Sequence, residues 1–234
     1  MRVLAITCHP DDMELTCAGT LLKCKARGDE VFVCHIANGN MGHMVIMPDE
    51  LREIRAKEAQ NAAALAGFNI VTTDVGDLTV NSADMNQVRA LIKVIRDVNP
   101  DLILCHSPED YCSDHCEASK LVFKASFDAS CPHFMPDLGP ATKVASIYYV
   151  DHAACMNFIP TEYVDVTDVM ELKEKMLACH ESQLVWLKEH DGIDVIDHQR
   201  VYARYRGLQS GVMYAEGFKP LLADQRMKTY RLLP

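Results

Sequence analysis

The sequence has no run of basic side chains, no apolar stretch that approaches 20 residues and no Cys-x-x-Cys pair. Nucleic acids and anionic membranes favour a basic face, so a formal net charge of −10 argues against both as partners. A membrane-spanning helix needs about 20 apolar residues, and none is expected here. The start Met1-Arg2 leads directly into a short strand pattern, too short for a signal peptide, so we expect a cytoplasmic protein.

Cysteine pairing is also not expected. The ten cysteines are scattered, and several lie inside apolar runs: Cys8, Cys17, Cys24, Cys34, Cys105, Cys112, Cys116, Cys131, Cys155 and Cys179. Disulfide frameworks usually belong to shorter secreted chains. We therefore expect reduced thiols that are mostly structural.

No internal repeat, low-complexity tract or linker divides the 234 residues, of which 49% are hydrophobic. This length suits one large α/β domain, or one with a small appended lobe, and we expect a single domain over residues 1–234. The first strand pattern is not followed by Gly-x-Gly-x-x-Gly, which argues against a dinucleotide-binding dehydrogenase.

Strand and helix patterns alternate along the chain. The apolar runs predict strands at 3–6, 30–36, 68–73, 101–105, 144–150 and 163–166. Helical spacing and capping residues predict helices at 15–26, 49–67, 83–98, 117–130, 168–188 and 193–218, and the Pro-rich segment 131–142 is expected to be a loop. This alternation predicts an α/β protein with a Rossmann-like, mostly parallel sheet flanked by helices on both faces.

The most informative segment is the turn after the first strand, where His9, Pro10, Asp11 and Asp12 lead into a helix. Open α/β sheets bind their ligands at the carboxyl ends of parallel strands. A hydrolytic zinc site needs nitrogen and oxygen ligands, an open position for water and a nearby base. Here His9 and one carboxylate can bind the metal while the other carboxylate acts on the substrate. The simpler alternative is that an aspartate only caps the helix.

A second polar segment, residues 106–115, follows the fourth predicted strand. It should reach the same edge of the sheet as the first turn. His106 and His115 are both candidates for the third metal ligand that the first turn lacks. A histidine at a helix start is more often a cap than a ligand. The expectation that His106 or His115 binds the metal therefore depends on the two loops lying close together.

These segments together resemble the PIG-L (LmbE-like) deacetylase family. The resemblance is carried by His9-Pro10-Asp11-Asp12-Met13-Glu14, Asp114-His115, Val164-Asp165-Val166-Thr167-Asp168, His180-Glu181-Ser182-Gln183, Ala203-Arg204-Tyr205-Arg206-Gly207 and Tyr214-Ala215-Glu216-Gly217-Phe218. It extends over nearly the whole chain. It implies a Rossmann-like fold and a zinc-dependent hydrolase that removes the acetyl group from an N-acetylated amino sugar or sugar conjugate.

By position, the resemblance implies that His9, Asp12 and His115 hold Zn²⁺ and that Asp11 is the general base for the water that the zinc activates. Other divalent metals can also occupy such a site. In the family an arginine at the start of the following helix contacts sugar hydroxyls, and Arg55 matches it better than Arg52. Alternatively, both arginines belong to a solvated helix face. Family members often form oligomers, so a homo-oligomer is one expectation.

One position departs from the family pattern. Cys112 stands where the family carries a histidine that stabilises the oxyanion or protonates the leaving amine, and Asp114 would normally orient that residue. A thiol is a weak hydrogen-bond donor. His106, His152 or Tyr111 could replace it, the reaction could differ, or the activity could be low. A structural Cys112 is the favoured interpretation, and a non-catalytic metal- and sugar-binding protein of the same fold is the alternative function.

Two further expectations concern other polar residues. Glu14 is expected to be structural, and His35, His133, His190 and His198 are expected to be surface or locally bonded histidines. A receiver domain of a signalling system also has an acidic pair after its first strand, but such a domain is about half as long as this chain.

Overall fold

The computed structural model describes residues 1–152 and 157–234, and the seven strands that it contains form one sheet. The strands are β1 (Arg2–Thr7), β2 (Glu30–Ala37), β3 (Asn69–Val75), β4 (Leu102–His106), β5 (Ser146–Val150), β6 (Glu162–Asp165) and β7 (Ala215–Pro220). Their order in the sheet is β3-β2-β1-β4-β5-β7-β6. The first five in this order are parallel, whereas β7 is antiparallel to both β5 and β6. The predicted mostly parallel sheet is confirmed.

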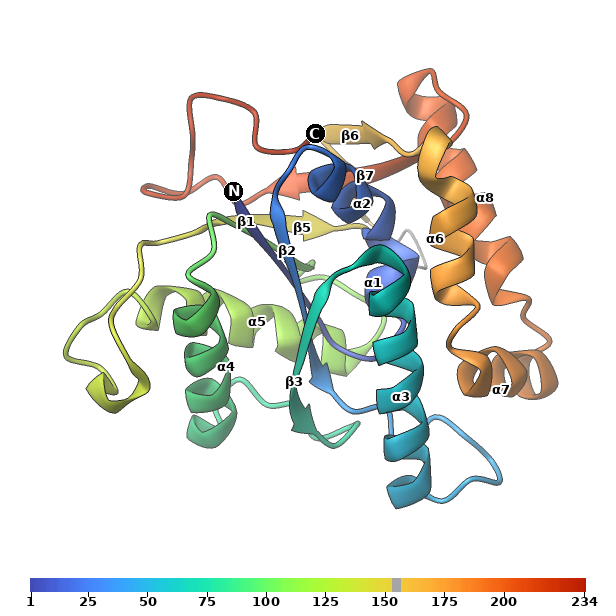
Figure 1. The fold of residues 1–234 in the computed structure, drawn as a ribbon, viewed down its shortest axis with the longest axis horizontal. Coiled ribbons are helices and arrows are strands. Elements are labelled where there is room, and N and C mark those ends of the chain that lie inside the picture. The colour runs from blue at the N-terminus through green and yellow to red at the C-terminus, as the bar shows by residue number, and fades with distance from the viewer. Residues whose placement is uncertain (153–156) are drawn as a thin grey trace.

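Eight α-helices surround this sheet in the described part of the chain (Figure 1). They are α1 (Asp12–Thr16), α2 (Ala18–Ala26), α3 (Pro48–Ala66), α4 (Met85–Val98), α5 (Ser113–Asp128), α6 (Met170–Leu177), α7 (Glu181–Asp191) and α8 (Val195–Ser210). Two short 3₁₀ helices are η1 (Pro136–Leu138) and η2 (Thr167–Val169). None of the described helices is long and apolar enough to cross a membrane.

Both faces of the sheet are buried. Val3 and Ala5 on β1 pack in one apolar cluster with residues of α1, α2, α3 and α6. Leu4 and Ile6 on the same strand belong to a second cluster with residues of α4 and α5. Successive side chains of a strand point to opposite faces, so the continuous apolar run of β1 is the pattern of a strand covered on both sides. The prediction of helices on both faces is confirmed.

Three predicted helices differ from the structure. The predicted helix at 193–218 ends at Ser210, because Gly211 adopts a left-handed conformation, and Ala215–Pro220 forms strand β7 instead. The predicted helix at 168–188 is divided into η2, α6 and α7, with a break before Glu181. The segment 15–26 is likewise divided at Cys17.

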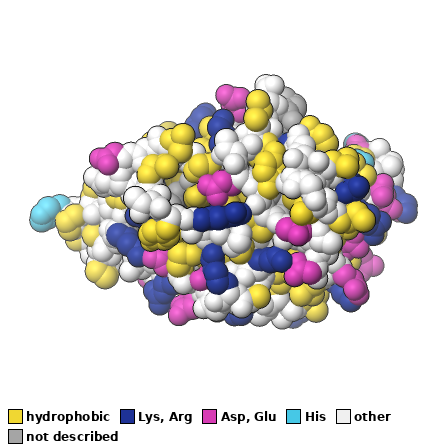
Figure 2. Space-filling view, turned by 90° about the horizontal axis from the view of Figure 1, so that it is seen from above, with side chains coloured by type: hydrophobic (Ala, Val, Ile, Leu, Met, Phe, Trp, Pro, Cys, Tyr) yellow, Lys and Arg dark blue, Asp and Glu magenta, His cyan; other side chains and the backbone are white. Residues whose placement is uncertain are grey.

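The described cysteines are all free thiols, as predicted. The tenth, Cys155, lies outside the described residues. Basic side chains are interspersed with acidic and apolar ones on the face drawn in Figure 2, so the described residues in that view form no continuous basic area.

Candidate metal and catalytic site

The turn between β1 and α1 is held by its own side chains. The carboxylate of Asp12 accepts a hydrogen bond of 2.6 Å from the backbone nitrogen of His9. Asp11 occupies the position before the first helical residue with φ of 105°, yet its carboxylate makes no capping hydrogen bond. A positive φ is strained for a residue other than glycine. The simpler interpretation of Asp11 as a helix cap is therefore not supported.

The donor atoms of His9, Asp12 and His115 form a small triangle. Nδ1 of His9 lies 3.5 Å from Oδ2 of Asp12 and 3.3 Å from Nε2 of His115. Nε2 of His115 lies 3.4 Å from the same carboxylate oxygen. A tetrahedral zinc ion with bonds of about 2.0–2.1 Å places its ligand atoms about 3.3 Å apart, so this N, N, O set fits a zinc ion. The two distant loops meet as the sequence predicts.

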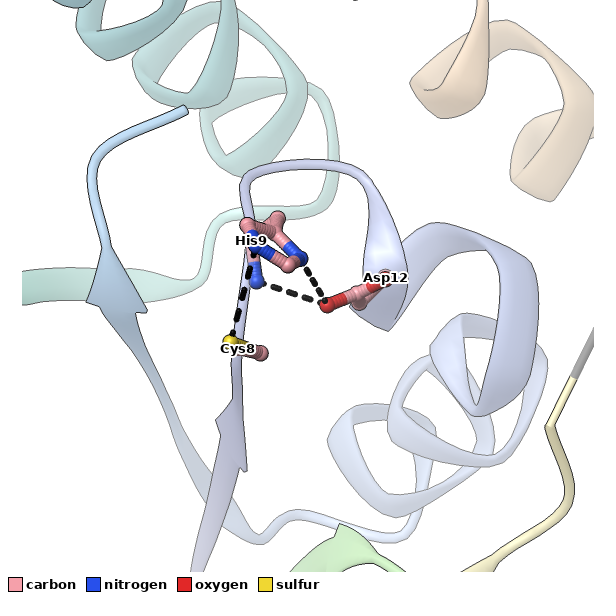
Figure 3. A group of neighbouring side chains, drawn as sticks. All are labelled: Cys8, His9 and Asp12. Atoms are coloured by element: carbon pink, nitrogen blue, oxygen red, sulfur yellow. Dashed lines mark hydrogen bonds and ion pairs between the residues drawn. The ribbon is translucent and has the colours of Figure 1, made fainter. Parts of the chain in front are cut away.

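Two other groups of side chains around Asp12 could also hold a metal. One consists of Asp12, His106 and His115, and the other of Cys8, His9 and Asp12. Figure 3 shows the second group, with Cys8 at the end of the strand and His9 and Asp12 on the turn above it. The sulfur of Cys8 lies 3.8 Å from Nε2 of His9.

His106 and His115 were both candidates for the third ligand, and their hydrogen bonds differ. Nε2 of His106 accepts a hydrogen bond of 2.9 Å from the backbone nitrogen of Cys8, so its lone pair is already used. Among the described residues no backbone nitrogen donates to Nε2 of His115, which faces the donor atoms of His9 and Asp12. Nε2 of His106 also lies 3.2 Å from Oδ2 of Asp12. The two rings stack with their centroids 4.1 Å apart. This arrangement favours His115 as the ligand, with His106 packed behind it.

Carboxylates hold the far side of both candidate ligand histidines. Oδ2 of Asp110 lies 3.2 Å from Nδ1 of His115, and Oδ2 of Asp114 lies 3.4 Å from Nε2 of His9. Burial favours the neutral ring of His115, but the charges of Asp12 and Asp110 outweigh it and raise its pKa to about 11. A metal would have to displace that proton. Carboxylates of this kind fix the orientation of metal-binding histidines.

Asp11 lies beside this triangle and is buried. Burial raises the pKa of its carboxyl to about 6, although the nearby guanidinium of Arg55 opposes that rise. Nη2 of Arg55 lies 3.2 Å from Oδ1 of Asp11. A general base works best when its pKa is close to the operating pH. The arrangement is chemically suited to take a proton from a water molecule next to a bound metal.

The family model described as GlcNAc-PI de-N-acetylase, PIG-L, matches residues 4–126, which is more than half of the chain. The chain belongs to the PIG-L family. Diacetylchitobiose deacetylase of Thermococcus kodakarensis is 31% identical over 235 residues, covering 93% of this chain and 82% of that protein. The solved structure of N,N'-diacetylchitobiose deacetylase from Pyrococcus horikoshii, complexed with an inhibitor, matches with a TM-score of 0.82 and 27% identity, over 94% of this chain and 83% of that one.

A relative with a different named activity is also similar to this chain. A 4-oxalmesaconate hydratase of Pseudomonas putida is 24% identical over 236 residues, covering 92% of this chain and 87% of that protein. Family membership therefore indicates an enzyme, and the similar proteins include both deacetylases and a hydratase.

The departure from the PIG-L pattern lies at the start of α5. Cys112 is half-buried, and its backbone nitrogen donates a hydrogen bond of 3.1 Å to Oδ1 of Asp110. Asp114 accepts a hydrogen bond of 2.6 Å from the backbone nitrogen of Leu78 and lies against His9. Its described contacts therefore support His9. The ring of Tyr111 stands edge-on to His115, with centroids 5.8 Å apart.

A second buried polar group was not predicted from the sequence. His180 and Glu14 are almost fully buried, and Nε2 of His180 lies 3.4 Å from Oε2 of Glu14. His35 is buried, and its Nδ1 lies 3.3 Å from Oγ1 of Thr7 on the neighbouring strand. Of the two environments expected for this histidine, it therefore has the locally bonded one. In the sequence, His180 stood out only as part of the His180-Glu181-Ser182-Gln183 motif of the family resemblance. No function was assigned to it there.

Proposed function

We propose that this PIG-L protein is a zinc-dependent N-deacetylase that removes the acetyl group from an N-acetylated amino sugar or its conjugate. The observation that carries the proposal is the triangle of donor atoms from His9, Asp12 and His115 with Asp11 beside it. The relatives named as diacetylchitobiose deacetylases support a sugar substrate. The whole chain, residues 1–234, would act as one domain.

The residues divide the work as follows. A zinc ion held by His9, Asp12 and His115 would supply a Lewis acid that polarises the amide carbonyl and lowers the pKa of water. Asp11 accepts the proton of the attacking water and returns it to the leaving nitrogen. Asp110 and Asp114 keep the two imidazoles in place. The products are acetate and a free amino group.

The donor that the family histidine would supply must come from another residue, because Cys112 is a weak donor. His106 accepts from Cys8 through Nε2, which leaves that nitrogen no proton to give. The ring of Tyr111 stands beside that of His115, and the Tyr111 side chain is largely exposed. We assign the role of oxyanion donor to Tyr111.

A second candidate function is the addition of water to a carbon–carbon double bond of an unsaturated carboxylic acid. The Pseudomonas putida relative is named as a hydratase, and the match covers most of both chains. Hydration also begins with a water that loses its proton to a base, but it expels no amine. In this protein Cys112 stands in place of the family histidine. The absence of that histidine would lower the rate less in a reaction that expels no amine.

One experiment separates the alternatives. Purified protein is analysed for metal and then incubated with N-acetylglucosamine, diacetylchitobiose and N-acetylglucosaminyl conjugates, with released amine measured by a fluorogenic reagent. In parallel, loss of ultraviolet absorbance of unsaturated tricarboxylates reports hydration. Amine release that disappears with a chelator and returns with zinc supports the deacetylase. Hydration without amine release would contradict the deacetylase proposal and support the hydratase. Bound metal without either reaction would support the non-catalytic alternative.

A further inference from the structure

A cavity of about 310 Å³ lies between α3 and the edge strand β3, which are neighbours in the fold (Figure 1). Its apolar lining consists of Pro10, Ala37, Ala56, Ala59, Ile70 and Val71. Ala56 on the helix and Thr72 on the strand line the cavity and are exposed, so a ligand can enter from solvent. The volume is in the range of about 300–1,000 Å³ that small-molecule sites usually have.

Three alanines keep this space open. Ala56 and Ala59 are three residues apart on α3 and therefore lie on one face of that helix, and Ala37 belongs to β2. Each of them contributes only a methyl group to the wall. Water next to such a wall is unfavourable, so an apolar body is preferred over solvent as the occupant.

His35 supplies a buried polar group to the cavity. It lies on β2 and is 3% exposed. Its Nδ1 is 3.3 Å from Oγ1 of Thr7, whereas its buried Nε2 has no hydrogen-bond partner among the described residues. A buried polar atom without a partner costs free energy, and a ligand that bonds to it removes that cost.

The ring of His35 is uncharged at neutral pH. Burial lowers the pKa of this side chain to about 4, although the carboxylate of Glu14 opposes that change. One nitrogen of a neutral imidazole donates a hydrogen bond and the other accepts one. A hydroxyl can both donate and accept, so it matches Nε2 whichever nitrogen carries the proton.

Charged side chains line the cavity only at exposed positions. Nε of Arg52 donates a hydrogen bond of 2.7 Å to Oδ1 of Asp74, and this ion pair connects α3 with β3. Glu53, next to Arg52, also lines the cavity. Because Arg52 is already paired, the described lining offers no free cation to an anionic ligand. Any charged ligand would also have to leave water for an apolar wall, so we expect a neutral one.

We propose that this cavity is a second binding site, which takes a small neutral compound with an apolar ring body and a hydroxyl group that hydrogen-bonds to Nε2 of His35. The described lining contains neither the candidate metal ligands nor Asp11, so the site is separate from the proposed catalytic site. Pro10, the residue before Asp11, forms part of the wall. A bound compound therefore contacts the turn that carries the candidate base, and the inference does not depend on which reaction that base serves.

The probe for the test is 2-naphthol. A cavity of about 150 Å³ holds benzene, so a two-ring alcohol suits one of about 310 Å³. Binding is followed by the chemical shifts of backbone amides in isotope-labelled protein. We expect changes at Ala37, Ile70 and Thr72 and none at His115. Affinity for 2-methylnaphthalene, which lacks the hydroxyl, should be about 3- to 10-fold weaker.

A pair of substitutions on α3 provides the matched control. Ala56→Leu fills the cavity from an exposed position and should abolish the shift changes caused by 2-naphthol. Ala64→Leu, at an exposed position of the same helix that does not line the cavity, should leave them unchanged. Binding that survives Ala56→Leu would overturn the proposal.

A crystal of the unsubstituted protein soaked in 2-naphthol is a second measurement that needs no variant. The hydroxyl oxygen should lie about 2.7–3.2 Å from Nε2 of His35. Equal affinity for 2-methylnaphthalene would overturn the assigned ligand class. Shift changes centred on His115, or competition with diacetylchitobiose, would place the probe in the candidate metal site and overturn the second site. Absence of binding, together with an oligomer that dissociates in Ala56→Leu, would show instead that the cavity is an interface between copies of the chain.

Discussion

Nδ1 of His115 lies 3.2 Å from Oδ2 of Asp110, and the opposite ring nitrogen faces Asp12 and His9. Two of the three candidate ligands thus depend on a carboxylate behind them, since Asp114 holds His9 in the same way. Such partners commonly change metal affinity by 10- to 100-fold when they are removed.

Replacing Asp110 by asparagine should therefore weaken zinc binding about 10- to 100-fold, because the amide cannot hold the imidazole with a full charge. Zinc affinity is measured by competition with a chromophoric chelator. Asp137→Asn, at an exposed ion pair with Arg89, is the control and should not change it. An unchanged affinity in Asp110→Asn would show that the loop alone orients His115.

Replacing Asp11 by asparagine removes the proton acceptor while keeping the shape of the side chain. We expect deacetylation to fall about 10²- to 10⁴-fold, the usual contribution of a general base. Zinc content, measured by elemental analysis, should stay within about twofold because Asp11 is not one of the three proposed ligands. Turnover at the unsubstituted rate would remove Asp11 from the role of base.

The pH dependence of kcat/KM should carry the signature of the same residue. Burial raises the pKa of Asp11 to about 6, and the base acts only when it is deprotonated. Activity should therefore be constant above this pH and decline about tenfold per unit below it. Rates measured in buffers of constant ionic strength test this expectation. A profile that is flat down to pH 4.5 would contradict it.

Replacing Cys112 by histidine restores the residue that the family carries at this position. Activity should stay the same or rise, by up to about 10²–10³-fold if the missing donor limits turnover. Cys131→Ser, at another half-buried cysteine, serves as the control. A large loss in kcat for Cys112→His alone would reveal that the thiol has its own function.

A buried ion pair against α1 and α2 is expected to affect the free energy of unfolding. Nζ of Lys173 lies 2.6 Å from Oε1 of Glu216, and both side chains are nearly inaccessible. Removing one partner of such a pair typically costs about 3–5 kcal/mol, so Glu216→Gln should lower the free energy of unfolding in urea by about that amount. Lys175→Met, which breaks the exposed pair with Glu171, should change it by less than about 1 kcal/mol. Equal losses in the free energy of unfolding would show that the buried pair stabilises the fold no more than the exposed pair does.

Local signals predicted the fold where they were strong. The helix expected at 49–67 is observed as α3 at Pro48–Ala66, since proline stands at its start and Gly67 follows its end in a left-handed conformation. The error at 193–218 has a different origin. Strand β7 exists because its residues pair with β5 and β6, and apolar spacing along one segment carries no information about such partners.

The candidate site was predictable in part for the same reason. His9, Asp11 and Asp12 are adjacent in a turn whose composition is unusual, and the parallel-sheet rule brought His115 to the same edge. The hydrogen bond between Cys8 and His106 and the contacts of Arg55 with Pro10 and Gly39 join residues far apart in the chain. The sequence therefore indicated the candidate ligands but not the side-chain contacts around them.

The carboxylate of Glu216 also accepts hydrogen bonds from the backbone nitrogens of Gly19 and Thr20, at the first turn of α2. The two ends of the Gly19 contact are 197 positions apart. During translation, the start of α2 therefore lacks the Glu216 carboxylate until β7 has left the ribosome. The turn that holds His9, Asp11 and Asp12 leads into α1, which directly precedes α2, so a nascent chain that already contains every proposed ligand still lacks the carboxylate that binds the start of α2.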